Sequence, residues 1–283
     1  MSHSLDLSTS ELLELWLHGK SPNTVSSYRR HVEGFFQHAA KPLTDITLLD
    51  IQTWQLSLSR KSPASQQTAL AALKSLLSFG HQLGILKVNV GKLARSPKAK
   101  DRLSERILSE AEVRSIIDGE TGPRNRTILR LLYSGGLRVS ELCALKWCDF
   151  KPRHSGGQIT VFGKGGHTRT VLLSPSLWEN LWELRGDSGA DDPVFRSRQV
   201  GLGGSYHLSR KQVYRIVRTA ARRARIEGNV SPHWLRHSHA SHSLDRGAPI
   251  HLVRQTLGHS SITITEKYLH ARPDDSSALY LDD

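Results

Sequence analysis

The sequence predicts a mostly α-helical protein of the α+β class, with an N-terminal four-helix bundle and a second, mainly helical domain that contains a small antiparallel β-sheet. Two patterns predict this. Apolar residues recur at helical spacing through most of the chain, and one pair of alternating segments flanks a glycine-rich turn. The 283 residues suffice for two domains with separate cores. No apolar run in the sequence approaches the ~18 residues of a membrane-spanning helix, so we expect no membrane partner.

Residues 1–90 are expected to form the bundle as the first domain. The predicted helix starts are a capping box at Ser8 to Glu11 and serine- or threonine-led starts at Ser21, Thr47 and Ser62. Each start is followed by apolar residues at helical spacing. Four short helices of this kind pack as a compact bundle. The pattern alone fits a dimerisation domain equally well.

Residues 91–106 lose this periodicity and are expected to link the two domains. The segment has six basic residues against Asp101 and Glu105; the basic ones are Lys92, Arg95, Lys98, Lys100, Arg102 and Arg106. Such a linker is suited to follow a phosphate backbone, although a merely solvated linker would have the same composition. Residues 107–283 are expected to form the second domain, opening with a capping box at Ser109 to Glu112.

The overall charge indicates the class of partner. A net charge of +13 indicates an anionic partner, and nucleic acid fits better than a membrane surface or an acidic protein. The two cysteines, Cys143 and Cys148, lie in one apolar stretch around Trp147. We expect both to be buried, reduced thiols, as in a cytoplasmic protein.

The segment S-G-G-L-R-V-S-E-L contains the first candidate functional residue, Arg138. Gly135 and Gly136 turn the chain, and Arg138 falls in the first turn of the next helix. Glu141, one turn later, can orient the guanidinium. Taken alone, a surface Arg–Glu pair is the more common interpretation.

Two alternating segments, 158–162 and 168–173, flank G-K-G-G-H and predict a β-hairpin with Lys164 at its tip. A lysine there could donate a proton to a leaving alkoxide while it contacts a phosphate. A lone lysine on a turn is more often only solvated. The glycines lack the spacing and the strand-to-helix context of a P-loop, so nucleotide binding is not predicted.

A strongly basic helix is predicted from Ser209. Val213, Val217 and Ala220 mark its apolar face. The charged residues on the remaining surface are all cations, namely Arg210, Lys211, Arg215, Arg218, Arg222 and Arg223. Because the helix has no acidic residue of its own, contact with nucleic-acid phosphates is favoured over a solvated face.

The segment from His233 to Tyr268 is predicted to form two helices and a shorter third. Gly247 and Gly258 end the first two, because glycine adopts the left-handed conformation at little cost. The expected caps are Ser231, followed by Pro232, for the first helix and Ser260 or Ser261 for the third.

This arrangement brings four chemical groups to the turns of linked helices: His233, Arg236, His259 and Tyr268. They are the groups needed to hold a phosphate and attack it. A tyrosine hydroxyl, with a reference pKa of ~10, is a poor nucleophile until a base or a cation favours its phenolate. Arginine forks stabilise the charge that gathers on the non-bridging oxygens of the transition state.

Taken in order, these motifs resemble the tyrosine recombinases, or phage-type integrases, and among them the simple, Xer-like members. The ordered set is G-G-L-R-x-S-E-L, the hairpin lysine, H-x-L-R-H, L-G-H and a tyrosine nine residues later. No piece is specific alone, but the set in this order is. The resemblance spans nearly the whole chain. It implies that a SAM-like core-binding domain clamps DNA opposite a catalytic domain.

The resemblance also implies an activity, the cutting and rejoining of DNA strands through a 3′-phosphotyrosyl link. The implied roles are a phosphate clamp by Arg138 and Arg236, protonation of the 5′ leaving oxygen by Lys164, general acid or base catalysis by His233, a phosphate hydrogen bond from His259, and attack by Tyr268. The bond energy stays in the protein–DNA ester, so no ATP, other cofactor or metal is expected. Members act on double-stranded DNA as tetramers, here of identical protomers or with a sister recombinase.

The helix with the H-x-L-R-H motif departs from this family in its polarity. His239 and Ser243 stand where Xer-like members usually place apolar residues. A helix of this polarity is expected to pack less well against a core. The histidines also raise a rival hypothesis, a metal site of His233, His237, His239 and His242. At ~100° per residue His242 falls opposite His233, so the four cannot converge, and only His233 and His237 have a usable spacing.

Two other functions remain open at this stage. A type IB topoisomerase would use the same chemistry in a single protomer, without a matched site. A DNA-binding accessory protein that no longer cuts would have no need of a tyrosine at position 268.

Overall fold

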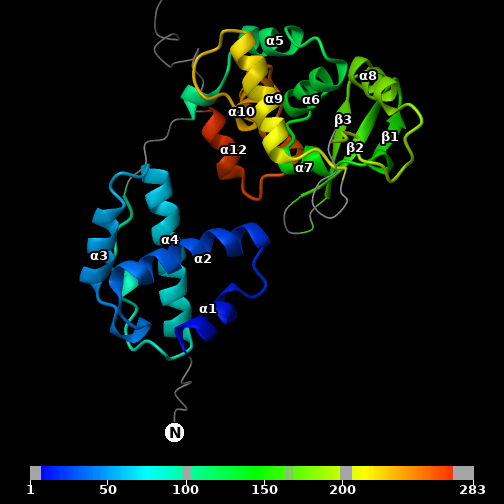
Figure 1. Ribbon diagram of the computed structural model, residues 1–283. Helices are drawn as coiled ribbons and strands as arrows, with labels where there is room; N and C mark the ends of the chain where they lie inside the picture. The colour runs from blue at the N-terminus through cyan, green and yellow to red at the C-terminus, as the bar shows by residue number, and fades with distance from the viewer. Residues whose placement is uncertain (1–7, 98–102, 164–165, 167, 198–205, 270–283) are drawn as a thin grey trace, which may run out of the picture. The chain divides into compact units, whose positions relative to one another are not determined.

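The structure is a computed structural model that describes residues 8–97, 103–163, 166, 168–197 and 206–269. The chain divides into two compact units, Met1–Asp101 and Arg102–Asp283. Helices dominate both, and the second also contains a three-stranded antiparallel sheet (Figure 1). The predicted fold class is therefore confirmed. No helix of the described ranges is long and apolar enough to cross a membrane.

The first unit is the expected bundle of four α-helices. They are α1 (Thr9–Leu17), α2 (Pro22–Ala39), α3 (Leu48–Ser57) and α4 (Pro63–Gln82), with short 3₁₀ turns η1 (Leu43–Asp45) and η2 (Val90–Lys92). The four predicted cap residues each accept a hydrogen bond from a backbone N–H of the first turn. Helix α4 contacts both α1 and α2. At the centre, Phe35 meets Trp54 edge to face, with 5.2 Å between the ring centroids.

The beginning of the expected linker packs on this first unit. Ala94 lies in its core, and its carbonyl accepts a hydrogen bond from Lys74 Nζ at 2.8 Å. Gln67 Nε2 donates to the carbonyl of Pro97 at 2.6 Å. Residues 98–102, which carry three of the six expected cations, lie outside the described residues. The boundaries 1–90, 91–106 and 107–283 remain predictions.

The second unit surrounds one large core. Its elements are η3 (Ser104–Arg106), α5 (Glu110–Asp118), α6 (Pro123–Ser134), α7 (Val139–Ala144), η4 (Trp147–Asp149), β1 (Phe150–Arg153), β2 (Gly156–Phe162), β3 (Thr168–Leu173), α8 (Pro175–Arg185), α9 (Arg210–Arg223), α10 (Pro232–Asp245), α11 (Ile250–Leu257) and α12 (Ile262–Leu269). Ile128, Leu132 and Leu235 are among its fully buried residues.

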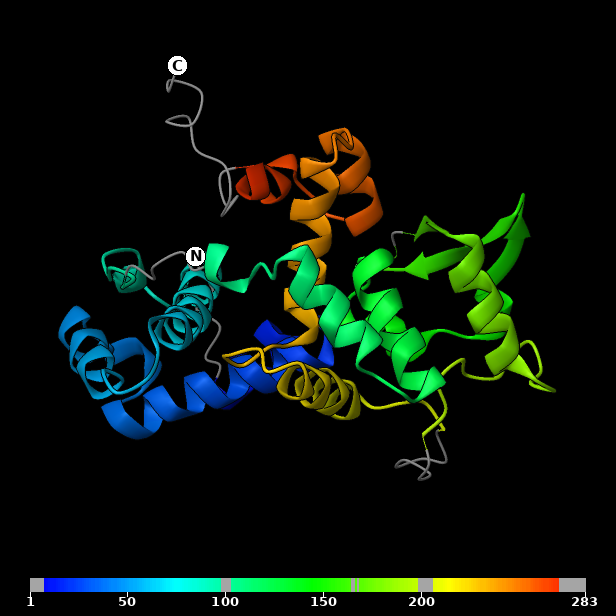
Figure 2. The same cartoon turned by 90° about the horizontal axis from the view of Figure 1, so that it is seen from above.

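The sheet has the order β1-β2-β3, and Phe162 pairs with Thr168 at the end of the predicted hairpin. Strand β1 was not predicted, because F-K-P-R is short and contains a proline. Helix α8 contacts both β2 and α6 (Figure 2). A Cβ at Gly157 would collide with the ring of Trp178, so this glycine lets α8 lie close to the sheet.

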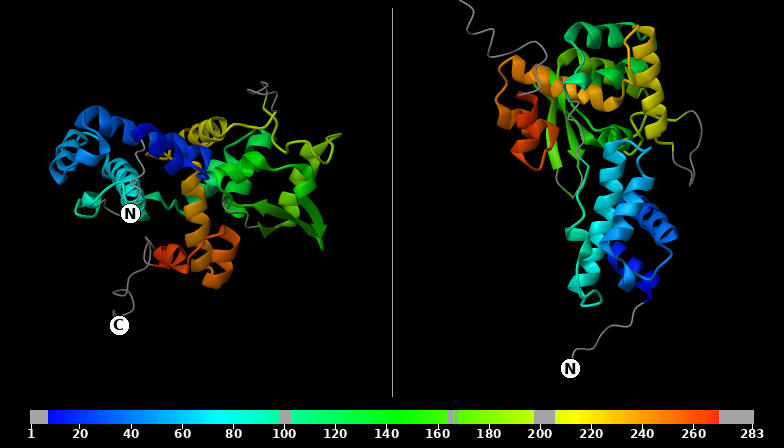
Figure 3. Two further views of the ribbon diagram at one scale, coloured as in Figure 1. Left: turned by 90° about the horizontal axis from the view of Figure 1, so that it is seen from below. Right: turned by 90° about the vertical axis from the view of Figure 1, so that its left-hand side faces the viewer.

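Helices α10, α11 and α12 contact one another at the end of the described chain (orange and red in Figure 3). His239 and Ser243, which depart from the family pattern, are both partly buried, and two other polar residues of α10 have hydrogen-bond partners. Ser238 Oγ accepts a hydrogen bond from Leu108 N at 2.8 Å, and His242 Nδ1 lies 2.9 Å from Tyr133 Oη. Ala240 and Leu244 complete a small apolar cluster. Polar and apolar contacts thus hold α10 against the neighbouring segments of the second unit.

One smaller expectation was confirmed in position only, and another was wrong for one of two residues. Ser231 occupies the N-cap position of α10, but its side chain makes no capping hydrogen bond in the described structure. Cys143 is partly buried, whereas Cys148 is exposed. In the 3₁₀ turn η4, Trp147 takes the core position and is 3% exposed, so the next side chain faces solvent.

Candidate active site

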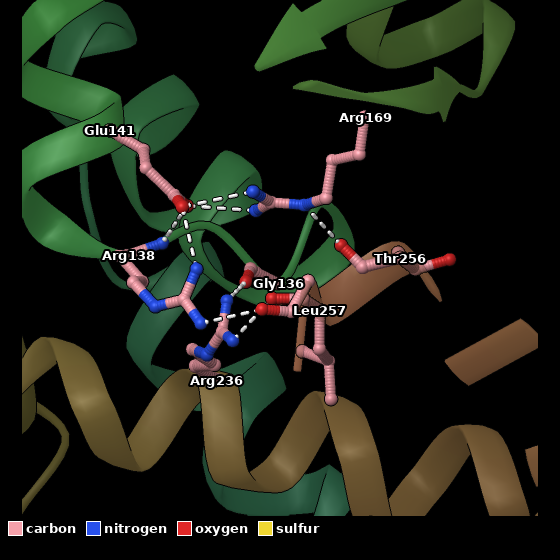
Figure 4. A network of polar contacts seen from close by, with 8 residues as sticks. Gly136, Arg138, Glu141, Arg169, Arg236, Thr256 and Leu257 are labelled. Carbon is pink, nitrogen blue, oxygen red and sulfur yellow. Dashed lines mark hydrogen bonds and ion pairs between the residues drawn. The ribbon is translucent and has the colours of Figure 1, made fainter. Parts of the chain in front are cut away.

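Three arginines from separate elements meet at the C-terminal end of α11 (Figure 4). A helix end leaves carbonyl groups without intrahelical partners, and it carries partial negative charge. Here Arg169 Nε donates to Thr256 O at 2.6 Å, Arg236 Nη2 to Leu257 O at 2.5 Å and Arg138 Nη2 to Gly258 O at 2.9 Å. The helix end therefore fixes three guanidiniums side by side.

Arg236 is the most deeply placed of the predicted phosphate ligands. Its residue is 5% exposed, and Nη1 also donates to Gly136 O at 2.5 Å. Gly136 has φ +56°, and a Cβ there would lie 2.9 Å from atoms of His239 and Leu257, so only glycine fits. Burial and the charge of Arg138 lower the pKa of Arg236 to about 9, which leaves it charged at neutral pH. Of the five N–H groups of a guanidinium, these bonds to the described chain use two.

Glu141 is buried between two of the arginines, with a side chain 4% exposed. Its carboxylate accepts two hydrogen bonds from Arg169, at 2.9 and 2.8 Å, and one from Arg138 Nη1 at 2.8 Å. Burial raises the pKa of Glu141, but the hydrogen bonds from Arg169 and Arg138 outweigh this and hold the pKa below its usual value. The interpretation as a surface ion pair is therefore wrong.

Arg138 is held from both sides without being buried. It is the N-cap residue of α7, where its backbone N–H donates to Glu141 Oε2 at 2.7 Å. With Glu141 on one Nη and the Gly258 carbonyl on the other, the guanidinium has a fixed orientation. Its side chain remains 31% exposed. This combination suits a group that must meet a ligand in a preset position.

Tyr268, on α12, packs its ring into the apolar cluster of Ala240, Leu244, Val253 and Leu257. The residue is only 4% exposed. Its hydroxyl lies 2.7 Å from Nδ1 of His237. Burial raises the pKa of Tyr268, and the charge of Arg236 offsets this only in part. The phenol is therefore protonated at neutral pH in this structure.

His259 lies beside the phenol. Its backbone N–H donates to Arg254 O at 3.2 Å, which closes the end of α11 around Gly258 with φ +62°. Its ring is parallel to that of Tyr268, at a centroid distance of 6.3 Å and an angle of 7°. Nδ1 lies 2.9 Å from Thr265 Oγ1. Burial, then the charges of nearby arginines, lower the pKa of His259 to about 4, so the ring is neutral.

His233 and Lys164 complete the predicted set. His233 stands in the first turn of α10, and its ring centroid is 6.4 Å from that of His237. Loss of hydration and the charge of Arg236 lower the pKa of His233. Lys164 lies outside the described residues. Shared contacts link the other five predicted residues: Arg138, His233, Arg236, His259 and Tyr268.

The histidines of α10 have separate partners. His237 Nδ1 contacts Tyr268, whereas His242 Nδ1 contacts Tyr133. Among the described residues, no three His, Cys, Asp or Glu side chains are grouped as metal ligands.

The basic helix α9 buries Val213 and Val217 and leaves its cations exposed. Arg223 is exposed as well, but it has an acidic partner, because its Nη1 lies 3.1 Å from Glu120 Oε2 of the α5–α6 loop. The exposed cations of α9 are Arg210, Lys211, Arg215, Arg218, Arg222 and Arg223.

Comparison with known proteins agrees with this arrangement. Residues 105–274 match the phage integrase family, and residues 12–82 match the N-terminal SAM-like domain of phage integrases. The chain belongs to the phage integrase family. The two matched regions together span most of the sequence.

Relatives of this phage integrase family chain include named recombinases. Tyrosine recombinase XerD of Mycobacterium tuberculosis is 32% identical over 280 residues, and the match covers 88% of this chain and 88% of the relative. Tyrosine recombinase XerC of Xanthomonas campestris pv. campestris is 34% identical, covering 88% of this chain and 79% of the relative. A crystal structure of a lambda integrase tetramer bound to a Holliday junction shares the fold, with a TM-score of 0.72 and 20% identity over 91% of this chain and 79% of that one.

Sequence reasoning missed Arg169 and gave His237 no role beyond a possible metal ligand. A signal for Arg169 existed, because strand alternation places it on the same side of β3 as the buried Val171 and Leu173. A basic residue on the inward side of a strand indicates a buried ionic partner. His237 is part of the H-x-L-R-H motif, but no pattern in the sequence shows that it contacts Tyr268.

Proposed function

We propose that this chain is a site-specific DNA recombinase that cuts and rejoins DNA strands through a covalent 3′-phosphotyrosyl intermediate. The observation that carries the proposal is the position of Tyr268. Its buried ring packs against α10 and α11, its hydroxyl contacts His237 of α10, and Arg138 and Arg236 are fixed at the end of α11. A phenol beside oriented guanidiniums is suited to attack a phosphodiester.

In the proposed reaction the arginines act before and during the attack. Arg138 and Arg236 bind the non-bridging oxygens of the scissile phosphate with N–H groups not used by Glu141 or the backbone carbonyls. Because those partners already fix both forks, little reorganisation is needed as charge develops in the transition state. Glu141 and Arg169 act as positioning residues for Arg138 and the α11 end.

The remaining roles follow the family pattern. His259, as a neutral imidazole, donates a hydrogen bond to the phosphate. His233 serves as a general acid or base, and Lys164 protonates the 5′ leaving oxygen. Tyr268 becomes linked to the 3′ phosphate, and attack by a 5′ hydroxyl reseals the strand. The ester conserves the bond energy, so the proposed cycle requires no ATP.

The proposed substrate is double-stranded DNA, and the proposed working assembly is a tetramer on two synapsed sites. The named relatives XerD and XerC and the lambda integrase tetramer on a Holliday junction support this assembly. The protomers would be identical or would alternate with a sister recombinase. Residues 1–90 would clamp the DNA and the exposed cations of α9 would contact its phosphates. A cytoplasmic location is part of the proposal.

A trapping experiment with a fragment library tests this function. Purified protein is incubated with sheared genomic DNA of its own host, covalent complexes are stopped with detergent, and the captured fragments are sequenced. A site-specific recombinase should enrich one short sequence element with cleavage at fixed positions. Captured fragments without a common sequence would favour the topoisomerase, and no capture at all would favour a DNA-binding accessory protein. Either result would contradict the proposal.

A further inference from the structure

We propose that His237 is a further catalytic residue, which accepts the proton of the Tyr268 hydroxyl as the phenol attacks the DNA phosphate. The proposal rests on the proposed function, because it concerns the first step of strand cleavage. The proposal assigns the base of this one step to the histidine that follows Arg236. His233, three residues before Arg236, keeps the acid role that the proposed function also allows it.

The contact between the two side chains is direct. Nδ1 of His237 lies 2.7 Å from Oη of Tyr268, and the ring centroids are 5.7 Å apart. This is the distance at which a general base takes up a proton without rearrangement. The two residues come from α10 and α12, which pack against each other, and the neighbouring Arg236 is fixed by two backbone carbonyls. His237 therefore belongs to the same rigid framework as the phosphate clamp.

The surroundings of His237 keep its ring neutral and able to accept a proton. The groups facing it are His233 and Arg236 on α10, Arg106 of η3, Tyr268 on α12 and His259 after α11. Burial is the largest influence and, with the positive charges of Arg106 and Arg236, lowers the pKa of His237 to about 4. None of these neighbours is a carboxylate. A phenol whose own pKa is raised by burial needs a base to attack at neutral pH. The low pKa of His237 leaves its acceptor nitrogen unprotonated there, although it also makes the ring a weaker base than an exposed imidazole.

The step is balanced in atoms and charge. The O–H bond of Tyr268 breaks, and its proton moves to Nδ1 of His237, whose other ring nitrogen carries hydrogen. The freed oxygen lone pair forms the new bond to phosphorus. The bond from phosphorus to the 5′ oxygen breaks, and that oxygen takes a proton from Lys164. In resealing, the imidazolium of His237 returns its proton to the departing phenolate.

The same helix contains a matched control. His242 Nδ1 lies 2.9 Å from Tyr133 Oη, so α10 makes two histidine–tyrosine hydrogen bonds of the same kind. The second bond packs α10 on α6 and has no part in the proposed chemistry. Asparagine retains an acceptor at the position of Nδ1 but cannot take up a proton at neutral pH. His237→Asn and His242→Asn therefore remove comparable groups, one of them from the proposed base.

The first test compares single-turnover cleavage of a nicked DNA substrate that carries the sequence recovered by trapping. His237→Asn should slow the formation of the covalent complex about 10²- to 10⁴-fold while DNA binding stays within about twofold. His242→Asn should cleave at the wild-type rate, even if it lowers the melting temperature as much as His237→Asn does. Equal rates for His237→Asn and wild type would overturn the proposal, whereas failure of the wild type to cleave would instead overturn the proposed function.

The second test separates proton transfer from positioning. A fluorinated tyrosine at position 268 has a more acidic phenol and needs the base less, so it should restore most of the lost rate to His237→Asn. In His237→Asn with ordinary tyrosine at position 268, the cleavage rate should rise tenfold per pH unit until the pH reaches the pKa of the phenol. In the wild type the rate should fall only as pH drops through about 4, where His237 becomes protonated. A purely positional role predicts no rescue by fluorination and parallel pH profiles, and either result would refute base catalysis.

Discussion

Replacing Tyr268 by phenylalanine is expected to abolish covalent capture of DNA. The change removes one oxygen atom, the proposed nucleophile, and keeps the ring that fills the cluster of Ala240, Leu244, Val253 and Leu257. Loss of a nucleophile lowers the rate by more than about 10⁴-fold, below detection in a gel assay of protein–DNA adducts. Binding to the same DNA fragment, measured by mobility shift, should be nearly unchanged.

The Tyr133→Phe variant is the control for this change. It also removes a tyrosine hydroxyl bonded to a histidine of α10, in this case His242. Each variant should lose about 1 kcal/mol of unfolding free energy, the typical net value of one hydrogen bond. Only Tyr268→Phe should lose adduct formation. An adduct that persists in Tyr268→Phe at the wild-type level would show that another residue is the nucleophile.

Replacing Arg236 by lysine is expected to cost both cleavage and stability. The guanidinium donates to the carbonyls of Gly136 and Leu257 and, by our proposal, to the phosphate as well. A single ammonium group cannot reach all three acceptors with the same geometry. We expect cleavage to fall about 10²- to 10³-fold, as for loss of one donor to a transition-state oxygen. The free energy of unfolding should fall by about 1.5–3 kcal/mol, which is the typical contribution of one hydrogen bond to a charged group.

Arg246→Lys provides the comparison for this charge-conserving change. Arg246 follows α10 and forms an exposed ion pair with Glu110, at 2.7 Å between Nη2 and Oε2. Exposed pairs of this kind add little to stability, so melting temperature and cleavage should remain near wild type. DNA binding by Arg236→Lys should also persist, since many phosphate contacts contribute to affinity. Equal loss of DNA binding and of cleavage would mean that Arg236 is only an ordinary contact to the DNA backbone.

Local signals in the sequence were enough to predict most of the fold. The capping boxes at Ser8 and Ser109 and the glycine that ends α11 lie where expected, because each depends only on neighbouring residues. The hairpin of β2 and β3 was equally clear from its alternation. Strand β1 was missed, since it lies at one edge of the described sheet, pairs there with β2, and its own four residues carry no strand pattern.

The parts of the site that could not be predicted depend on contacts between distant segments. The burial of Glu141 follows from Arg169, which is 28 positions further along the chain. The bond between His237 and Tyr268 requires α12 to fold back on α10 across 31 positions. Sequence order identified the candidate groups, whereas their hydrogen-bond partners, and with them the proposed role of His237, emerged only from the packing of the helices.

The identity of the DNA-linked residue is the most direct test of the whole account. Trapped complexes of the wild-type protein are digested with nuclease and trypsin, and the nucleotide-bearing peptide is fragmented in a mass spectrometer. The tryptic peptide that starts at Tyr268 also contains Tyr280, so fragmentation must locate the modified ring. The account predicts a 3′-phosphonucleotide on Tyr268. A nucleotide on any other residue, or linked through its 5′ phosphate, would contradict it.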